Sequence, residues 1–129
     1  MPDNPKVVDA SALASLLFGE PGAEEVAGRL EGCNLVAPSL LRYEVGNVCL
    51  KKIARYPKKK GALLKAFAFM EQMDIREVGV PIGEIVLLAR SERLSVYDAA
   101  YLWLSRELES ELVTLDEKLR KVSGNRRNI

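Results

Sequence analysis

The sequence predicts an α/β fold in which a short parallel sheet of four or five strands carries helices on both faces. Short apolar, β-branched segments alternate along the chain with longer segments whose apolar residues recur at helical spacing. The short segments are too apolar to face water, which is typical of strands covered by helices on both sides. A chain of 129 residues without a linker or an internal repeat suits a single domain, here residues 1–129.

Four segments are predicted to be strands, because each is short, apolar and bounded by proline or polar residues. They cover residues 6–9, 34–37, 75–80 and 112–115. In an open parallel sheet, binding sites lie at the carboxyl ends of the strands. Asp9 and Asp116 fall at such ends, so we expect this edge of the sheet to carry the functional site.

The segments between the strands are predicted to be helices. They cover residues 10–18, 21–30, 38–56, 58–73, 82–93, 96–108 and 117–122. Pro21 is placed to open one helix and Pro57 to end another, whereas the polar residues 123–129 are expected to form a loose tail. One apolar helical face fits the core or, less well, a dimer interface. Its residues are Leu63, Leu64, Phe67, Phe69, Met70 and Met73.

The composition is that of an ordinary globular protein, with 48% hydrophobic and 29% charged residues. No run approaches the roughly 20 apolar residues of a membrane span, and the first residues lack a secretion signal, so we expect a cytoplasmic protein. Cys33 and Cys49 form no C-x-x-C pair, which argues against a structural zinc site and a disulfide framework. The chain has no histidine, so its acidic residues have no imidazole to work with.

Positive charge is concentrated in residues 51–65. This segment carries seven basic residues and no acidic residue, whereas the rest of the chain carries more acids than bases. One interpretation is a solvated helical surface, and the other is a patch that attracts a polyanion such as RNA. The candidate contacts to RNA phosphates are Lys51, Lys52, Arg55, Lys58, Lys59 and Lys60.

Four acidic residues lie at the borders of apolar segments. They are Asp9, Glu44, Asp98 and Asp116. A carboxylate in such a place is costly unless a positive group binds it. Hard divalent cations suit this role, because Mg²⁺ prefers oxygen ligands and is commonly held by a few carboxylates and water. The pattern therefore predicts a Mg²⁺ or Mn²⁺ site that cleaves a phosphate ester with a metal-activated water.

Each acid taken singly also has a structural explanation. Asp9 and Asp116 would cap the helices that follow them, and Asp98 would complete a Ser-x-x-Asp capping box with Ser95. Glu44 would be a surface residue at the edge of its helical stripe. The interpretations are compatible, because a carboxylate at the start of a helix can also face a site. Neighbouring polar side chains that are candidates for orienting the carboxylates or metal-bound water are Ser11, Asn47 and Thr114.

Four motifs, in order along the chain, resemble those of the PIN-domain ribonucleases, in particular the small VapC-type toxins of toxin–antitoxin pairs. They are VDAS at residues 8–11, LRYEVGNV at 41–48, SVYDAAYLWL at 95–104 and LVTLDEKL at 112–119. The resemblance implies a PIN-like three-layer sandwich and metal-dependent endoribonuclease activity. It also implies a homodimer and inhibition by a small antitoxin protein. Family members often close with a further strand, for which the ending NRRNI is poorly suited.

The resemblance assigns roles to the same residues. It implies an acidic quartet that binds the metal, made of Asp9, Glu44, Asp98 and Asp116. It implies a supporting role for Ser11, Asn47 and Thr114.

Three other kinds of domain stay open on the sequence alone. A receiver domain needs a phosphoacceptor aspartate near mid-chain, but residues 45–70 hold no acid. An aspartyl-phosphate phosphatase needs Asp-x-Asp, and Asp9-Ala10-Ser11 lacks the second aspartate. The remaining alternative is a non-catalytic RNA- or protein-binding domain with a PIN-like fold. Clustered carboxylates argue against it, because without a cation they repel one another and serve no binding purpose.

Overall fold

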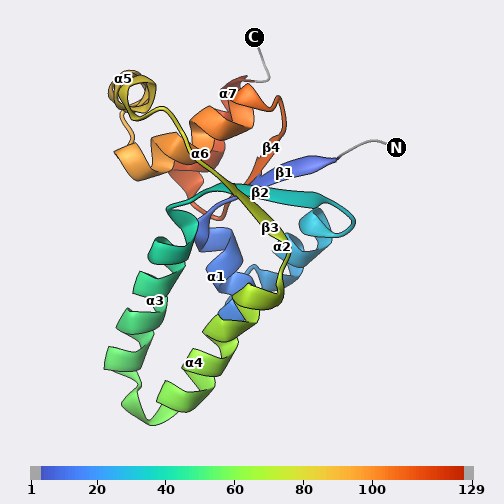
Figure 1. Cartoon of the computed structure of the whole chain (residues 1–129), viewed down its shortest axis with the longest axis vertical. Coiled ribbons are helices and arrows are strands. Elements are labelled where there is room, and N and C mark those ends of the chain that lie inside the picture. Colours follow the sequence, from blue (N-terminus) through green and yellow to red (C-terminus); the bar gives the residue numbers. More distant parts are fainter. Residues whose placement is uncertain (1–3, 127–129) are drawn as a thin grey trace.

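Four parallel strands form the centre of the computed structural model, which describes residues 4–126 (Figure 1). The strands are β1 (Pro5–Val8), β2 (Asn34–Pro38), β3 (Ile75–Val78) and β4 (Glu111–Val113). Their order across the sheet is β3-β2-β1-β4, and each neighbouring pair is parallel. The predicted α/β fold with a short parallel sheet is confirmed.

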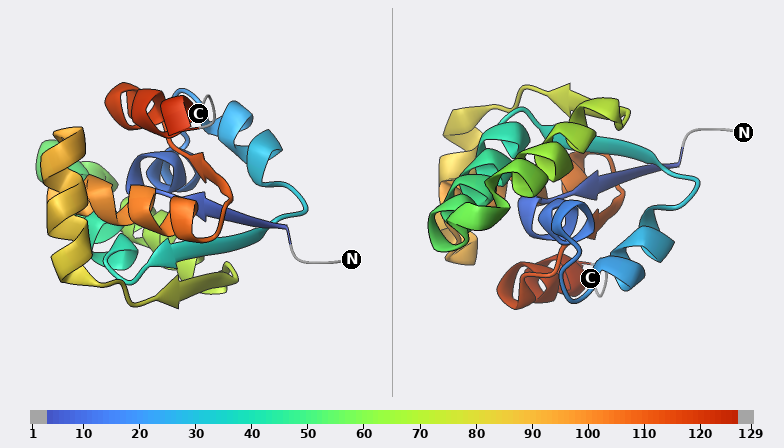
Figure 2. Two further views of the ribbon diagram at one scale, coloured as in Figure 1. Left: turned by 90° about the horizontal axis from the view of Figure 1, so that it is seen from above. Right: turned by 90° about the horizontal axis from the view of Figure 1, so that it is seen from below.

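Helices cover both faces of this sheet. They are α1 (Ala10–Phe18), α2 (Ala23–Leu30), α3 (Leu41–Arg55), α4 (Lys60–Ala68), α5 (Ile82–Glu92), α6 (Val96–Glu107) and α7 (Glu117–Arg126). In Figure 1, α1, α3 and α4 lie on one side of the sheet and α5, α6 and α7 on the other, which gives three layers. Figure 2 shows the same arrangement, with α6 in front of the sheet in one view and α1 in front in the other.

The core lies between the sheet and these helices, which explains why the strands are short and apolar. Val7 and Val8 of β1 are fully buried, as is Val113 of β4. Burying such a side chain contributes about 1.5–3 kcal/mol. On the outer side of α6, Ala99 and Ala100 pack against α5, and their small side chains allow the two helices to lie close together.

The helix expected from Pro21 begins two residues later. Pro21 and Gly22 form a turn instead, and Gly22 has a φ of 95°, a left-handed conformation that favours glycine. A side chain at Gly22 would also meet Leu115, whose Cδ1 lies 3.0 Å from the position of an added Cβ. The turn therefore places α2 close to the chain that follows β4.

The helix expected over residues 58–73 is divided into three pieces. Residues Pro57–Lys59 and Phe69–Gln72 form 3₁₀ turns on either side of α4. The apolar face of this segment is mixed: Met70 is buried, whereas Leu64 and Phe69 are exposed. α3 and α4 pack together as a hairpin that extends away from the sheet (Figure 1).

The last predicted helix is longer than expected. It runs to Arg126, so the prediction of a loose tail is wrong for residues 123–126, and residues 127–129 lie outside the described part of the chain. The helix continues because neither proline nor a left-handed glycine interrupts it, and Ser123 donates its hydroxyl to the Arg120 carbonyl at 3.0 Å. Residues 4–126 contain no strand beyond β4.

Cys33 and Cys49 are both free thiols. Cys49 is buried on α3, and burial raises the pKa of its thiol, which keeps it protonated and unreactive. Nowhere in residues 4–126 is there a helix with the length and apolar character that crossing a membrane requires.

Candidate active site

Asp9 is a buried carboxylate at the carboxyl end of β1. It caps α1, because its Oδ1 accepts a hydrogen bond from the Ala12 N–H at 3.0 Å. Ser11 donates its hydroxyl to the same oxygen at 2.8 Å, and Thr114 donates to Oδ2 at 2.5 Å. Burial raises the pKa of Asp9, these three hydrogen bonds lower it, and the charge of Asp98 raises it further. The net effect of these contributions is a raised pKa. Hydrogen bonds hold both carboxylate oxygens of Asp9 in place.

Ser11 and Thr114 join the start of α1 to the end of β4. Their hydroxyl oxygens lie 3.3 Å apart. The N–H of Leu115 donates to Ser11 Oγ, and the N–H of Asp116 donates to Thr114 Oγ1, each at 3.0 Å. These contacts fix the loop after β4 against Asp9.

Glu44 lies in the first turn of α3 and faces α6. The hydroxyl of Tyr101 donates to its Oε1 at 2.6 Å. Burial raises the pKa of Glu44, the hydrogen bond from Tyr101 lowers it, and the charges of Asp98 and Asp9 raise it further. One oxygen of this carboxylate is therefore restrained, and the group as a whole is destabilised in its charged form.

Asp98 and Asp116 both lie at the starts of helices. The N–H of Asp98 donates to Ser95 Oγ at 3.0 Å, which caps α6. Burial raises the pKa of Asp98, the charge of Asp116 raises it further, and Ser95 and Lys118 lower it. Asp116 is exposed and accepts a hydrogen bond from the Leu119 N–H at 2.8 Å, which caps α7. The capping role considered from the sequence is confirmed for Asp116, whereas at α6 the capping side chain is Ser95 and Asp98 contributes its N–H.

The four acids form one electrostatic group at the carboxyl end of the sheet. Asp98 raises the pKa of both Asp9 and Glu44, and Asp116 raises that of Asp98. Mg²⁺ and Mn²⁺ take carboxylate oxygens as ligands, so the chemistry and charge of this set fit a divalent cation. The fit is not that of a preformed cage, because no three acidic or cysteine side chains in residues 4–126 stand close enough together to hold a metal.

The family model of the PIN domain matches residues 6–125 of the chain. The chain belongs to the PIN-domain family. This PIN domain is 29% identical to Ribonuclease VapC3 of Pyrobaculum aerophilum over 118 residues, which cover 88% of this chain and 90% of the relative. Its fold is similar to the crystal structure of PAE2754 from Pyrobaculum aerophilum, with a TM-score of 0.72 and 26% identity over 90% of this chain and 82% of that one. The resemblance to VapC-type PIN domains is confirmed.

Asn47 makes no hydrogen bond to the four acids within the described part of this PIN domain. It lies one turn after Glu44 on α3 with an exposed side chain. It helps to line an apolar hollow between α3 and α4, together with Tyr43, Leu50 and Phe67. Of the three predicted supporting residues, Ser11 and Thr114 contact an acid, and Asn47 forms no hydrogen bond to one within residues 4–126.

The basic segment lies at the far end of the α3–α4 hairpin (Figure 1). At a helical rise of about 1.5 Å per residue, Arg55 is roughly 16 Å along α3 from Glu44. The tip of the hairpin therefore does not line the acidic group. The exposed basic residues of the segment are Lys51, Arg55, Lys58, Lys59, Lys60 and Lys65.

Lys52 differs from the other predicted RNA contacts, because it is engaged within the fold. Its ammonium forms an ion pair with Glu20 and lies 5.6 Å from the centre of the Phe18 ring. Both partners belong to the end of α1 and the turn after it. Lys52 thus ties α3 to α1, and this role reduces its availability to a phosphate.

The local sequence does not reveal the part that Tyr101 plays. The residue stands in the motif SVYDAAYLWL, and its side chain is buried. A buried phenol needs a hydrogen-bond partner, and this was the available signal. The identity of that partner, Glu44, is set by the packing of α3 against α6 and has no trace in the local sequence.

Proposed function

We propose that this PIN domain is a divalent-metal-dependent endoribonuclease and the toxin of a toxin–antitoxin pair. The observation that carries the proposal is the gathering of four mutually repelling acids at the carboxyl ends of the parallel strands. A group of carboxylates that are partly withdrawn from water and raise one another's pKa is poised to bind a cation. The similarity to a protein named Ribonuclease VapC3 supports RNA as the substrate.

Asp9 is the fixed point of the proposed site. Its carboxylate cannot turn without breaking its hydrogen bonds to Ser11, Ala12 and Thr114. Glu44 is held at one oxygen by Tyr101, which leaves its other oxygen to meet a ligand. Such restraint places ligands before the substrate arrives, so less reorganisation is needed during the reaction.

The residues that would hold the metal are Asp9 and Asp98 as principal ligands, with Glu44 and Asp116 binding directly or through water. When bound, Mg²⁺ or Mn²⁺ supplies an activated water and relieves charge on the phosphate. A carboxylate of the quartet that is not a ligand accepts the proton of the attacking water. The amino ends of α1, α6 and α7 also meet near these residues, and the partial positive charge of helix amino ends favours a phosphate there.

The basic segment would hold the RNA backbone away from the cleaved bond. Its exposed cations offer contacts to phosphates, which supply most of the sequence-independent affinity for nucleic acids. Because the segment is distant from Glu44 along α3, we assign it to binding and not to chemistry. Asn47 lies between the two regions on α3 and is placed to contact the RNA chain on its way to the acids.

We also propose that the protein forms a homodimer in the cytoplasm and that a small antitoxin inhibits it. Exposed apolar side chains on α5 and at the start of α6 support an interface, since clustered apolar surface indicates a protein contact. They are Ile82, Val86, Leu87, Val96 and Tyr97. An antitoxin that inserts an arginine among the four acids would replace the charge of the metal and block the substrate.

The test is cleavage of a labelled RNA in Mg²⁺, in Mn²⁺ and in excess chelator. We expect chelation to abolish cleavage and Asp98→Asn to lower its rate about a hundredfold or more. Asp74→Asn is the matched control, because Asp74 is an exposed carboxylate that precedes β3, at the opposite edge of the sheet. Undiminished cleavage in chelator, or in Asp98→Asn, contradicts the metal mechanism.

The alternative is a PIN domain that binds RNA without cleaving it. The observation that favours it is the absence, within residues 4–126, of three acidic side chains already close enough to hold a metal. RNA binding without turnover in either metal, with affinity unchanged in Asp98→Asn, is the outcome that this alternative predicts.

A further inference from the structure

The apolar hollow between α3 and α4 has a volume of about 550 Å³. This volume is within the range of sites that bind small molecules, roughly 300–1,000 Å³. On α3 its wall runs from Tyr43, the residue before Glu44, to Leu50, the residue before Lys51. The hollow therefore lies between an acid of the proposed metal site and the basic segment of the hairpin.

Two aromatic rings line the hollow. The side chain of Tyr43 is 83% exposed, and that of Phe67 is half-buried. Leu50 adds a further exposed apolar side chain to the wall. Apolar side chains gathered on an open surface indicate a contact with another molecule. Aromatic rings of this kind stack on the faces of nucleic-acid bases, whatever the base sequence.

Gly46 leaves open the part of the hollow that faces Phe67. Glycine in the middle of a helix is less stable than alanine, because it gains more backbone freedom on unfolding. Gly46 has no positive φ, and a Cβ added to it would meet only the Phe67 ring, whose Cζ lies at an ordinary contact distance of 3.7 Å. The fold does not require glycine here, whereas a ligand in the hollow would need the space.

Asn47 supplies the hollow with an unpaired amide. Its side chain is exposed and forms no hydrogen bond within residues 4–126, so its donors and its acceptor are available to a ligand. An amide can pair with the donors and acceptors on the edge of a base. Arg42 also lines the hollow, but its guanidinium is ion-paired with Glu71 and Glu77. The available polar group is therefore uncharged, which suits a base and not an anion.

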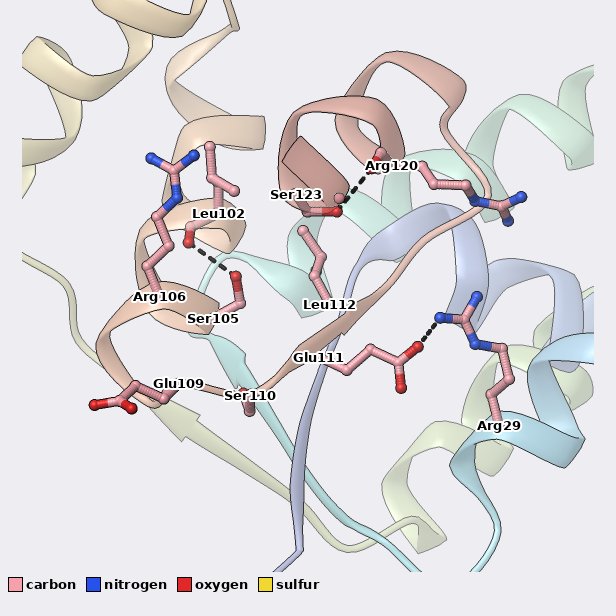
Figure 3. A pocket seen from close by; sticks show the side chains of 11 residues that line it. Arg29, Leu102, Ser105, Arg106, Glu109, Ser110, Glu111, Leu112, Arg120 and Ser123 are labelled. Carbon is pink, nitrogen blue, oxygen red and sulfur yellow. Dashed lines mark hydrogen bonds and ion pairs between the residues drawn. The ribbon is translucent and has the colours of Figure 1, made fainter. Parts of the chain in front are cut away.

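The cavity beside β4 differs from this hollow (Figure 3). Three guanidinium groups line it, and each is ion-paired with a glutamate of the fold. The arginines are Arg29, Arg106 and Arg120, and the glutamates are Glu25, Glu92 and Glu111. No positive charge in that wall is left for a ligand.

The cations beside the hollow favour a polyanion as its occupant. Lys51 and Arg55 follow the hollow on α3, and within the described residues neither is ion-paired with a carboxylate. A second copy of the chain is a poor occupant, because a symmetric contact here would bring two basic segments to one interface. A nucleic acid supplies phosphates for these cations and a base for the hollow at the same time.

We propose that the hollow binds one unstacked base of a single-stranded RNA. The base stacks on Tyr43 with its edge at Asn47, and neighbouring phosphates contact Lys51 and Arg55. Resting on the proposed function, this base site adds that the RNA is single-stranded where it is bound. Bases inside a duplex are paired and stacked, so they cannot enter the hollow.

The test measures binding in chelator, so that the RNA stays intact. The two probes are a labelled single-stranded RNA of about ten nucleotides and a sugar-phosphate chain of the same length and charge without bases. The wild type should bind the RNA about tenfold more tightly or better, and Tyr43→Ala should lower this preference roughly tenfold. Asn47→Ala and Gly46→Leu, which fills the hollow, should also lower it. Affinity for the chain without bases should stay unchanged in all three variants.

The matched control is Phe69→Ala, which removes an exposed aromatic ring outside the hollow and should keep the preference of the wild type. Equal affinities of the wild type for the two probes, or an unchanged preference in Tyr43→Ala, overturn the proposal. So does a Tyr43→Ala variant that turns from dimer to monomer and keeps the preference, since a second copy would then cover the hollow. Tyr43 is exposed, so Tyr43→Ala decides the matter if Gly46→Leu fails to fold.

The same binding measurement separates this base site from the nuclease activity. A preference for RNA over the chain without bases, lost in Tyr43→Ala, supports the base site even if neither metal produces cleavage, and such a protein would contradict the proposed nuclease. Cleavage by a wild type that shows no preference between the probes overturns the base site and leaves the nuclease standing.

Discussion

The hydroxyl of Tyr101 donates to Oε1 of Glu44 across 2.6 Å and joins α6 to the first turn of α3. Tyr101 is buried and Glu44 is half-buried, so each group is the hydrogen-bond partner that water would be at the surface. Burial raises the pKa of Tyr101, which keeps its hydroxyl protonated as a donor at neutral pH. The bond fixes one oxygen of a carboxylate that belongs to the proposed metal site.

Replacing Tyr101 with phenylalanine is expected to weaken both the fold and the activity. Tyr101→Phe removes the donor and leaves Glu44 without this partner, which should lower the free energy of unfolding by about 1–3 kcal/mol. The pKa of Glu44 should rise, because the hydrogen bond from Tyr101 lowers it in the wild type. Urea denaturation measures the first effect and RNA cleavage the loss of rate.

Tyr97→Phe is the control for this change. Tyr97 lies one turn earlier on α6, and its side chain is exposed. The same loss of a hydroxyl there should change stability by less than about 0.5 kcal/mol. Equal effects of the two substitutions would show that the bond to Glu44 contributes nothing.

The metal-free protein is expected to lose stability as the pH rises from acid towards neutral, because the clustered acids lose their protons over this range. The pKa values of Asp9, Glu44 and Asp98 are raised in the folded state from ordinary values of 3.8, 4.5 and 3.8. The folded chain therefore holds protons that the unfolded chain has released. Their contribution to stability is complete below the ordinary values and is lost as the pH rises through the raised ones.

The measurement is urea denaturation in chelator from about pH 4 to about pH 7, for the wild type and Asp98→Asn. Taking the difference between the two proteins cancels the contributions of titrating groups that they share. The wild type should lose more stability than the variant over this interval. A difference that is flat, or of opposite sign, would contradict the repulsion inferred here.

Much of the fold could be predicted from the sequence, because its signals are local. The apolar pair Val7-Val8 bounded by Pro5 indicates a buried strand, and the structure has β1 there. The predicted start of α2 and end of α7 were wrong, because they depend on backbone conformations that the residue types alone do not specify. Pro21-Gly22 forms a turn because Gly22 adopts a left-handed conformation, and residues 123–126 continue α7 although they are polar.

The candidate site could be predicted only in part. Asp9 and Thr114 stand next to apolar strands, which marks them in the sequence, and the structure joins them although 105 residues separate them. The bond between Glu44 and Tyr101 and the ion pair between Lys52 and Glu20 could not be predicted. They arise where helices meet across the fold, and the residue types alone do not specify which partners meet.

The basic segment is expected to make salt-dependent contacts to RNA. Replacing Lys58, Lys59 and Lys60 with alanine should weaken binding and flatten the plot of log K against log salt, by roughly 0.7 for each lost phosphate contact on a single strand. Folding should change little, because all three side chains are exposed. Arg90→Ala on α5 serves as a control for loss of charge elsewhere, and an unchanged slope in the lysine variant would mean that the segment does not bind RNA.

The proposed homodimer is expected to depend on the exposed face of α5. Leu87→Glu places a charge in that face, where the wild-type side chain is 66% exposed, so the monomer should fold normally. Sedimentation at micromolar concentration should show a dimer for the wild type and a monomer for the variant. Glu84→Leu, an exposed change on the same helix that adds no charge, should stay dimeric. A wild type that sediments only as a monomer would contradict the proposed homodimer.

The central claim is that Asp9, Glu44, Asp98 and Asp116 form one metal site, and thermal melting of the wild type and Asp98→Asn tests it most directly. In chelator the variant should melt higher, because one repelling charge is gone and the N–H of residue 98 still donates to Ser95 Oγ, which caps α6. Excess Mg²⁺ or Mn²⁺ should stabilise the wild type, by about 2.7 kcal/mol at a hundredfold excess over Kd, and the variant much less. A wild type that gains nothing from either metal, together with a variant that melts lower in chelator, would contradict the claim.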